Sequence, residues 1–309
     1  MLPERAATRR SRPGRTTASA GVRRTVTAYL FLLPALVLLG VFTFYPVVFG
    51  TVLSLFEYTV ITPPRFVGAA NFQALWGDRY FWIALRNSVV YLAVVPVLQL
   101  ASIVLALWVR RPFRGVAWFR AAYYLPVVTS IVVVGLLWRW LYDDAGLVNY
   151  VLLRLGIVRA PIHWLTDPRL ALYAVMLVTV WKGLGYYMVI YLAGLEAIPP
   201  AYDEAAALDG AGALARLFRV TIPLLRPSIL LASTISAIAA LRVFEEVYVM
   251  TGGGPVFSTY TLFLYMFDQA FNGLHLGYAA AIGVVLAAIT IVLSVVNFRL
   301  LQQGGLSYY

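Results

Sequence analysis

The stretch YDEAAALDGAGALARLFRVTIPLLRP, residues 202–227, decides how the whole chain is interpreted. It carries acidic residues near its start, is rich in alanine, and is interrupted by Gly210 and Gly212. The segments on either side of it are apolar enough to cross a bilayer. A short helical hairpin placed between two membrane spans indicates a contact with something outside the bilayer.

The composition is typical of a membrane protein. The chain has 309 residues, of which 62% are hydrophobic and only 12% charged, too little polar surface for a globule in water. Helices of about 20 residues span a hydrocarbon core of about 30 Å. We therefore expect an all-α polytopic protein with six transmembrane helices in residues 28–301, from the apolar segments 29–53, 89–109, 121–141, 170–195, 229–249 and 277–300.

The net charge of +11 follows the predicted topology. If the six spans alternate, 15 of the 24 basic residues fall on one side, seven of them in residues 1–24. The positive-inside rule then places both termini in the cytoplasm of a multi-pass protein of a prokaryotic plasma (inner) membrane. Residues 1–27 are expected to form a disordered basic tail and residues 302–309 a short second tail. No aromatic and basic stripe indicates nucleic-acid binding.

Catalytic chemistry is not indicated. The chain has a single lysine, Lys182, and no phosphate-binding loop, so ATP hydrolysis would require another subunit. His163 and His275 lie in separate connections without further metal-ligand spacing, and there is no cysteine. We expect a non-catalytic protein with no cofactor and no metal site.

Two of the apolar segments are interrupted. In the fourth, Lys182 stands beside Gly183, Gly185 and aromatic residues; a charge at that depth costs at least about 2.5–3.5 kcal/mol, so Lys182 should face a wet cavity or bond to backbone carbonyls. The glycines allow a bend or a close backbone approach. The fifth segment stays apolar only to Leu241, and Arg242 is then spaced to pair with Glu245 and Glu246 along a helix.

The hairpin has the signals of two helices. Pro199-Pro200 can start the first, Gly210 and Gly212 permit the turn, Ala213–Val220 start the second, and Pro223 and Pro227 should end it. An acidic, alanine-faced helix favours a groove on a protein over a lipid surface. The connection 142–168 is long enough to dock a soluble partner or to be an ordinary solvated loop.

The hairpin also resembles a known family. Glu204-Ala205-Ala206, Asp209-Gly210-Ala211, Phe218 and Ile222-Pro223 are similar to the EAA loop of permease subunits of binding-protein-dependent ABC importers. The stretches FVGAANFQALWGDRYFWIALRNS, GLLWRWLYDDAGLVN and VYVMTGGGP extend the resemblance over nearly the whole chain. Within the family, the TGGGP loop resembles the carbohydrate-uptake branch, in its maltose and glycerol-phosphate first-permease type.

The resemblance implies partners and site residues. The partners would be a second, non-identical permease, two cytoplasmic ABC ATPase subunits and an extracytoplasmic solute-binding protein that delivers a sugar-like substrate. The EAA loop, about residues 196–227, would contact the ATPase through Tyr202, Glu204, Ala205, Ala206, Asp209, Gly210 and Ala211. The substrate path would include Lys182, Gly183, Tyr186, Ser236, Ala240 and Val243.

The sequence leaves other transport functions open. Ala240 and Val243 are apolar where a maltose-type site has amides, which argues against maltose itself. The solute could instead be a phosphate ester, an amino acid or a peptide. A stand-alone channel or ion-coupled carrier, with Lys182 and the Arg242, Glu245 and Glu246 group as its ion path, would leave the hairpin unexplained.

Overall fold

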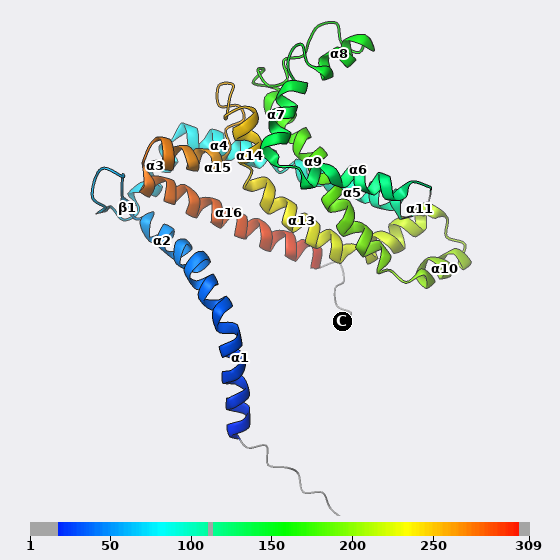
Figure 1. The fold of residues 1–309 in the computed structure, drawn as a ribbon, viewed down its shortest axis with the longest axis horizontal. Helices are drawn as coiled ribbons and strands as arrows, with labels where there is room; N and C mark the ends of the chain where they lie inside the picture. Colours follow the sequence, from blue (N-terminus) through cyan, green and yellow to red (C-terminus); the bar gives the residue numbers. More distant parts are fainter. Residues whose placement is uncertain (1–17, 111–113, 303–309) are drawn as a thin grey trace, which may run out of the picture. The chain divides into compact units, whose positions relative to one another are not determined.

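The computed structural model describes residues 18–110 and 114–302, which are mostly helical (Figure 1). The chain divides into two compact units at residues 52 and 53. The first unit contains one long helix in three parts: α1 (Ala18–Leu39), η1 (Gly40–Phe44) and α2 (Tyr45–Leu53), of which Leu53 already belongs to the second unit. This helix begins at Ala18, ten residues before the expected start of the spans at residue 28, so the later part of the tail 1–27 is helical and not disordered as expected. Residues 1–17 lie outside the described part.

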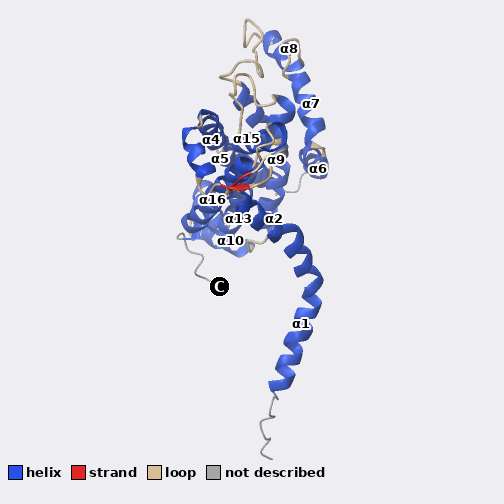
Figure 2. Ribbon diagram, turned by 90° about the vertical axis from the view of Figure 1, so that its left-hand side faces the viewer, coloured by secondary structure: helices blue, strands red, loops and turns tan. Residues whose placement is uncertain are grey.

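The second unit contains the remaining elements. They are β1 (Phe56–Glu57), β2 (Arg65–Phe66), α3 (Ala70–Gly77), α4 (Arg79–Tyr91), α5 (Val94–Val109), α6 (Val116–Val128), α7 (Ile131–Leu141), α8 (Leu147–Arg154), α9 (Ala171–Glu196), α10 (Pro200–Leu208), α11 (Ala213–Arg216), η2 (Leu217–Thr221), α12 (Ile222–Leu224), α13 (Arg226–Leu241), α14 (Glu245–Met250), α15 (Leu262–Phe267), η3 (Asp268–Asn272) and α16 (Leu276–Gln302). Figure 2 shows that loops gather at the end that carries α8, whereas α10 lies away from that end.

The apolar helices agree with a polytopic membrane protein but are not six uniform rods. In the described residues, four helices are long and apolar enough to cross a membrane: Thr25–Leu53, Arg79–Val109, Ala171–Glu196 and Leu276–Arg299. Two further crossings are possible if each of two bent helix pairs counts as one. One pair is α6 with α7, bent by 100°, and the other joins Ala213–Leu224 to α13, bent by 66°.

The bend between α6 and α7 corrects the expectation of a continuous helix over residues 121–141. Pro126 has no N–H to donate within α6, and Thr129 and Ser130 have extended ψ angles of 137° and 135°. The helix restarts at Ile131. The carbonyls of the last turn of α6 are therefore left without the partners that a continuing helix would supply.

The hairpin connection also differs in detail from the expectation. Gly210 has a φ of +80°, as the predicted turn requires, but Gly212 has an ordinary φ of −68°. Pro223 does not end the second helix but lies inside α12. The π-helical turn η2 comes directly before α12 and has already altered the hydrogen-bond register there. The break comes at Leu225, directly before α13.

Helix α9 runs through its glycines without a break. A Cβ on Gly185 would lie 2.1 Å from the carbonyl oxygen of Tyr123 in α6, and one on Gly194 would lie 2.1 Å from the hydroxyl of Ser228 in α13. The glycines of α9 thus allow close approach of two neighbouring helices, which was the second of the two alternatives left by the sequence. Besides α6 and α13, α9 packs along α5 (Figure 1).

An aspartate joins three helices away from the hairpin. Asp78 caps α4 by accepting a hydrogen bond from the N–H of Tyr80, and its Oδ2 accepts from the hydroxyls of Tyr265 in α15 and Tyr278 in α16. Burial opposes ionisation of Asp78, but these hydrogen bonds outweigh it and hold the pKa of the carboxyl below its ordinary value. The carboxylate therefore stays ionised and keeps α4, α15 and α16 together.

The close approach of α9 to α6 gives a first prediction. Gly185→Ala should destabilise the protein by at least about 1–3 kcal/mol, because the added methyl meets a backbone oxygen that cannot move without shifting α6. Gly183→Ala is the matched control, since its nearest neighbours are Leu98 methyls at 3.2 Å that can rotate away. Thermal unfolding of both variants in detergent should show a lower midpoint for Gly185→Ala alone; equal midpoints would contradict the packing described.

Candidate functional site

The candidate site is a cavity of about 640 Å³ in the second unit. This volume lies within the range of small-molecule sites in proteins. Its walls come from the α4–α5 junction, from the middle of α9, from α13 and from the segment between α13 and α14, with Val127 of α6 and Phe263 of α15 completing it. Aromatic and aliphatic side chains alternate with a few polar and charged groups, as in sites for small organic solutes.

The structure brings all six sequence-predicted substrate-path residues to this cavity. Tyr186 of α9 is 40% exposed. By contrast, Ser236 and Ala240 of α13 and Val243 directly after it are buried. Tyr91 and Thr179, which the sequence did not single out, also line the cavity and share a hydrogen bond of 2.6 Å. The predicted residues that line this one cavity are Lys182, Gly183, Tyr186, Ser236, Ala240 and Val243.

Lys182 is held by the broken end of α6. Its Nζ donates hydrogen bonds to the carbonyl oxygens of Pro126, Val127 and Thr129 at 3.1, 3.2 and 3.2 Å. Two of these carbonyls are in the last turn of α6 and the third is on its C-cap residue. Both alternatives from the sequence are present together, since Lys182 bonds to backbone carbonyls and also lines the cavity.

Buried polar contacts fix three helices behind the cavity. Gln99 in α5 donates to the Ser236 hydroxyl at 2.7 Å and to the carbonyl of Ala232 at 3.3 Å in α13, and it accepts from the Tyr191 hydroxyl of α9. Ser236 in turn donates to the carbonyl of Ser233 at 3.1 Å. Ser236 is thus tied into the helix packing as well as lining the cavity. The sequence did contain a signal for Gln99, because it is the one glutamine in the largely apolar run VVPVLQLASIVLALWV.

The expected pairing of Arg242 with Glu245 and Glu246 is wrong. Helix α13 ends at Leu241 and α14 begins at Glu245, so the three side chains are not on one continuous helix and the i+3 and i+4 spacing does not apply. Within residues 18–110 and 114–302 the ion pairs are His163 with Asp144 and Arg216 with Asp203. Arg242, Glu245 and Glu246 therefore face the cavity as separate charges.

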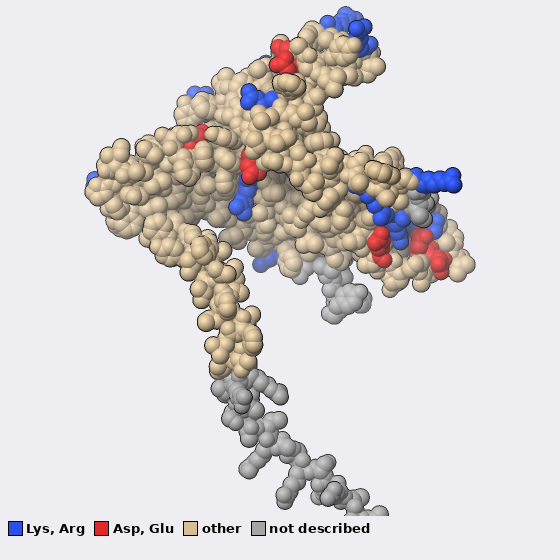
Figure 3. Space-filling view, viewed as in Figure 1, with Lys and Arg blue, Asp and Glu red and all other residues tan. Residues whose placement is uncertain are grey.

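The hairpin of α10 and α11 is closed by an ion pair and presents apolar side chains. Arg216 donates to Asp203 at 2.8 Å across the turn that Gly210 makes. Charged side chains gather over α10 and α11, while most of the rest of the visible surface is uncharged (Figure 3). Of the predicted coupling residues, Tyr202, Glu204, Ala205, Asp209 and Gly210 are exposed, and Ala206 and Ala211 are half-buried.

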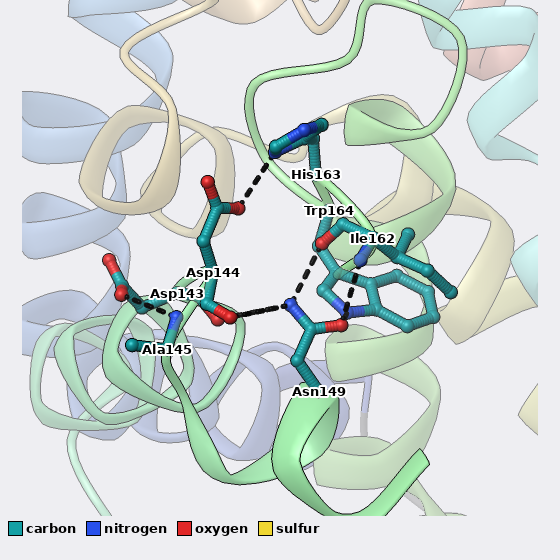
Figure 4. A network of polar contacts seen from close by, with 7 residues as sticks. All are labelled: Asp143, Asp144, Ala145, Asn149, Ile162, His163 and Trp164. Carbon is teal, nitrogen blue, oxygen red and sulfur yellow. Dashed lines mark hydrogen bonds and ion pairs between the residues drawn. The ribbon is translucent and has the colours of Figure 1, made fainter. Parts of the chain in front are cut away.

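The connection between α7 and α9 is an ordered structure rather than a loose loop (Figure 4). Asn149 in α8 is fully buried; its amide donates to the carbonyls of Asp143, Asp144 and Ile162, and its oxygen accepts from the N–H groups of Ile162 and Trp164. His163 contacts Asp144 at 2.9 Å. A second cavity, of about 410 Å³, lies between this connection and the Met250–Pro255 turn.

Tyr142 lies beneath that second cavity. Its ring stacks on Trp164 with 5.4 Å between centroids, and burial raises the pKa of its hydroxyl to about 12. The hydroxyl is therefore a neutral donor, and its partner is the carbonyl of Ala174 in α9 at 3.4 Å. Among the described residues, no group of three or more His, Asp or Glu side chains is arranged to hold a metal.

Apolar helices, a central cavity bounded by broken helices, and an exposed hairpin together define a membrane permease. The chain belongs to the family described as binding-protein-dependent transport system inner membrane component, whose model matches residues 99–303.

Similar proteins match this chain over most of its length. The chain is 37% identical over 290 residues to the lactose transport system permease protein LacF of Rhizobium radiobacter, covering 92% of this chain and 97% of that protein. It is 36% identical to the sulfoquinovosyl glycerol transport system permease protein SmoG of Agrobacterium fabrum, covering 89% and 90%. A chain of a bacterial ABC transporter involved in import of the acidic polysaccharide alginate has the same fold, with a TM-score of 0.80 at 23% identity, covering 92% of this chain and 98% of that one.

The contacts of Lys182 give a second prediction. Lys182→Met should lower the thermal midpoint of the protein by several degrees, because each carbonyl left inside the protein without a partner costs about 1–3 kcal/mol. Arg242→Gln is the control, since Arg242 lines the same cavity, is exposed, and forms no ion pair in the described part of the chain. A midpoint for Lys182→Met as high as that of Arg242→Gln would show that the three hydrogen bonds do not stabilise the bend.

Proposed function

We propose that this chain is the permease subunit of an ATP-driven importer and forms the translocation path for a sugar or a related polyol. A solute-binding protein outside the cytoplasm would deliver the solute, and two separate ATPase subunits would supply the energy. A second, non-identical permease would complete the path. Family membership and the names of relatives that transport lactose and sulfoquinovosyl glycerol support the solute class.

The observation that carries the proposal is the apolar surface of the hairpin. Leu208 is 90% exposed, Leu214 73% and Phe218 66%, all on a segment that also carries charged residues. Exposed large side chains clustered on one short element are typical of a protein contact. A groove on an ATPase subunit would bury them, with Glu204 as a polar contact beside them.

The topology proposed for this function has six crossings, counting each bent pair as one, and both termini in the cytoplasm of a prokaryotic cell. The arginines at positions 110, 216, 219 and 226 support this orientation by the positive-inside rule. The hairpin then faces the compartment that holds ATP. The connection between α7 and α9 and the Met250–Pro255 turn face outward, where a binding protein would dock.

In the proposed mechanism, the hairpin is coupled to the cavity through the helices that precede and follow it in the chain. Helix α9 lines the cavity with Lys182, Gly183 and Tyr186 and ends at Glu196, four residues before α10 begins. The hairpin then leads through α12 into α13, which lines the opposite wall with Ser236 and Ala240. ATP-driven movement of the hairpin would shift both walls together, as rigid-body rocking of packed helices. Access to the cavity would thereby alternate between the two sides.

The turn of the hairpin gives a third prediction. Gly210→Ala should leave the protein inserted in the membrane but strongly reduce solute-stimulated ATP hydrolysis, because a φ of +80° costs an alanine about 1–2 kcal/mol and the strained turn would displace α10. Glu204→Arg should have the same effect by reversing the charge of the contact. The reconstituted complex with its binding protein provides the measurement.

Gly212→Ala is the matched control for this experiment. Gly212 has an ordinary φ of −68°, and a Cβ there would meet nothing within 4 Å, so stimulation should remain near that of the wild type. Normal stimulation in Gly210→Ala and in Glu204→Arg would refute a coupling role for the hairpin.

A further inference from the structure

Four charged side chains line the central cavity: Lys182, Arg242, Glu245 and Glu246. Their formal charges cancel, two positive against two negative. A charged solute brought into such a site loses hydration, and it binds only where an opposite charge is available to compensate it. The charge of an acceptable solute therefore depends on which of the four side chains can turn toward it.

Lys182 is not available to a solute. An ammonium group has three N–H donors, and those of Lys182 are matched by the three carbonyls of Pro126, Val127 and Thr129. These carbonyls stand at the C-terminal end of the 13-residue helix α6, where the helix dipole places partial negative charge. The lysine is thus held and compensated by the protein itself, although it lies at the cavity wall.

The other three charges are free to meet a solute. Arg242 and Glu245 are exposed, Glu246 is partly buried, and none of them forms an ion pair within the described ranges. From this chain, a solute in the cavity therefore meets one guanidinium and two carboxylates. Sugar hydroxyls can both donate to carboxylates and accept from a guanidinium, and Tyr186, Tyr187 and Phe244 supply aromatic faces for the sugar rings.

We propose that this cavity selects electrically neutral saccharides and excludes anionic ones, with Glu245 and Glu246 as the specificity-determining residues and Lys182 as a positioning residue. The inference rests on the proposed function, because it assumes that the solute is a sugar. An anionic sugar would gain one contact with Arg242 but would approach the carboxylates of Glu245 and Glu246, which form no ion pair within the described ranges. The importer of the acidic polysaccharide alginate has the same fold, yet a likeness of fold leaves the charge of each cavity to its own residues.

Two sugars that differ in one group test the selection. Methyl β-glucoside and methyl β-glucuronide have the same ring and differ at C6, where the glucuronide carries a carboxylate. Binding of each, and of lactose as a larger neutral sugar, is measured by saturation-transfer NMR on the complete transporter complex in nanodiscs. The binding protein is left out, so that its own sugar site does not contribute to the signal. We expect the glucuronide to bind at least tenfold more weakly than the glucoside.

Variants assign the selection to particular residues. Glu245→Gln with Glu246→Gln keeps the shape and the acceptor oxygens but removes both charges, and it should raise glucuronide binding severalfold while leaving glucoside binding little changed. Arg242→Gln, at an exposed position, should weaken glucuronide binding further, and it keeps the test available if the double variant does not assemble.

The outcomes separate this inference from the proposed function. Equal binding of the two glycosides, a preference for the glucuronide, or a loss of glucuronide binding alone in Lys182→Met would overturn the neutral selection while leaving a sugar permease intact. If neither glycoside nor lactose binds, the sugar function falls together with the selection.

Discussion

The structure of the cavity depends on one interaction, the capping of a broken helix by a lysine from its neighbour. The bend after α6 leaves backbone carbonyls without helical partners, and Lys182 of α9 supplies three hydrogen bonds to them. Neither feature is stable alone, because a buried ammonium and unpaired carbonyls are each costly in an apolar environment. Together they satisfy one another. Gly185, one turn further along α9, keeps the two backbones close enough for the contact.

This pairing also connects the cavity with the hairpin. The helix that carries Lys182 ends at Glu196, four residues before α10 begins, so in the proposed mechanism a displacement of the hairpin would be transmitted to the lysine and to the end of α6. Buried contacts of Gln99 with Tyr191 and Ser236 tie α5 and α13 to the same helix. The helices around the cavity can therefore move as a packed body, which rocking between two access states requires.

The sequence predicted the parts of this arrangement that are local. Composition identified a helical membrane protein, the glycine at position 210 marked the turn of the hairpin, and Lys182 was conspicuous in its apolar segment. The break after α6 was missed because Pro126, Thr129 and Ser130 lie in a run long enough and apolar enough to be taken as one span, and proline is tolerated within transmembrane helices. The pairing of Arg242 with Glu245 was wrong because it assumed a helix that ends at Leu241.

We propose that the hairpin is the contact through which an ATPase subunit moves this chain. The chain contains no cysteine, so Leu208→Cys places a unique thiol at a side chain that is 90% exposed at the end of α10. Disulfide cross-linking in the assembled transporter should join this thiol to a cysteine placed in the ATPase groove, and the link should block solute-stimulated hydrolysis until it is reduced. Labelling of the thiol by a membrane-impermeant reagent from outside the cell, with no cross-link to the ATPase, would contradict the account.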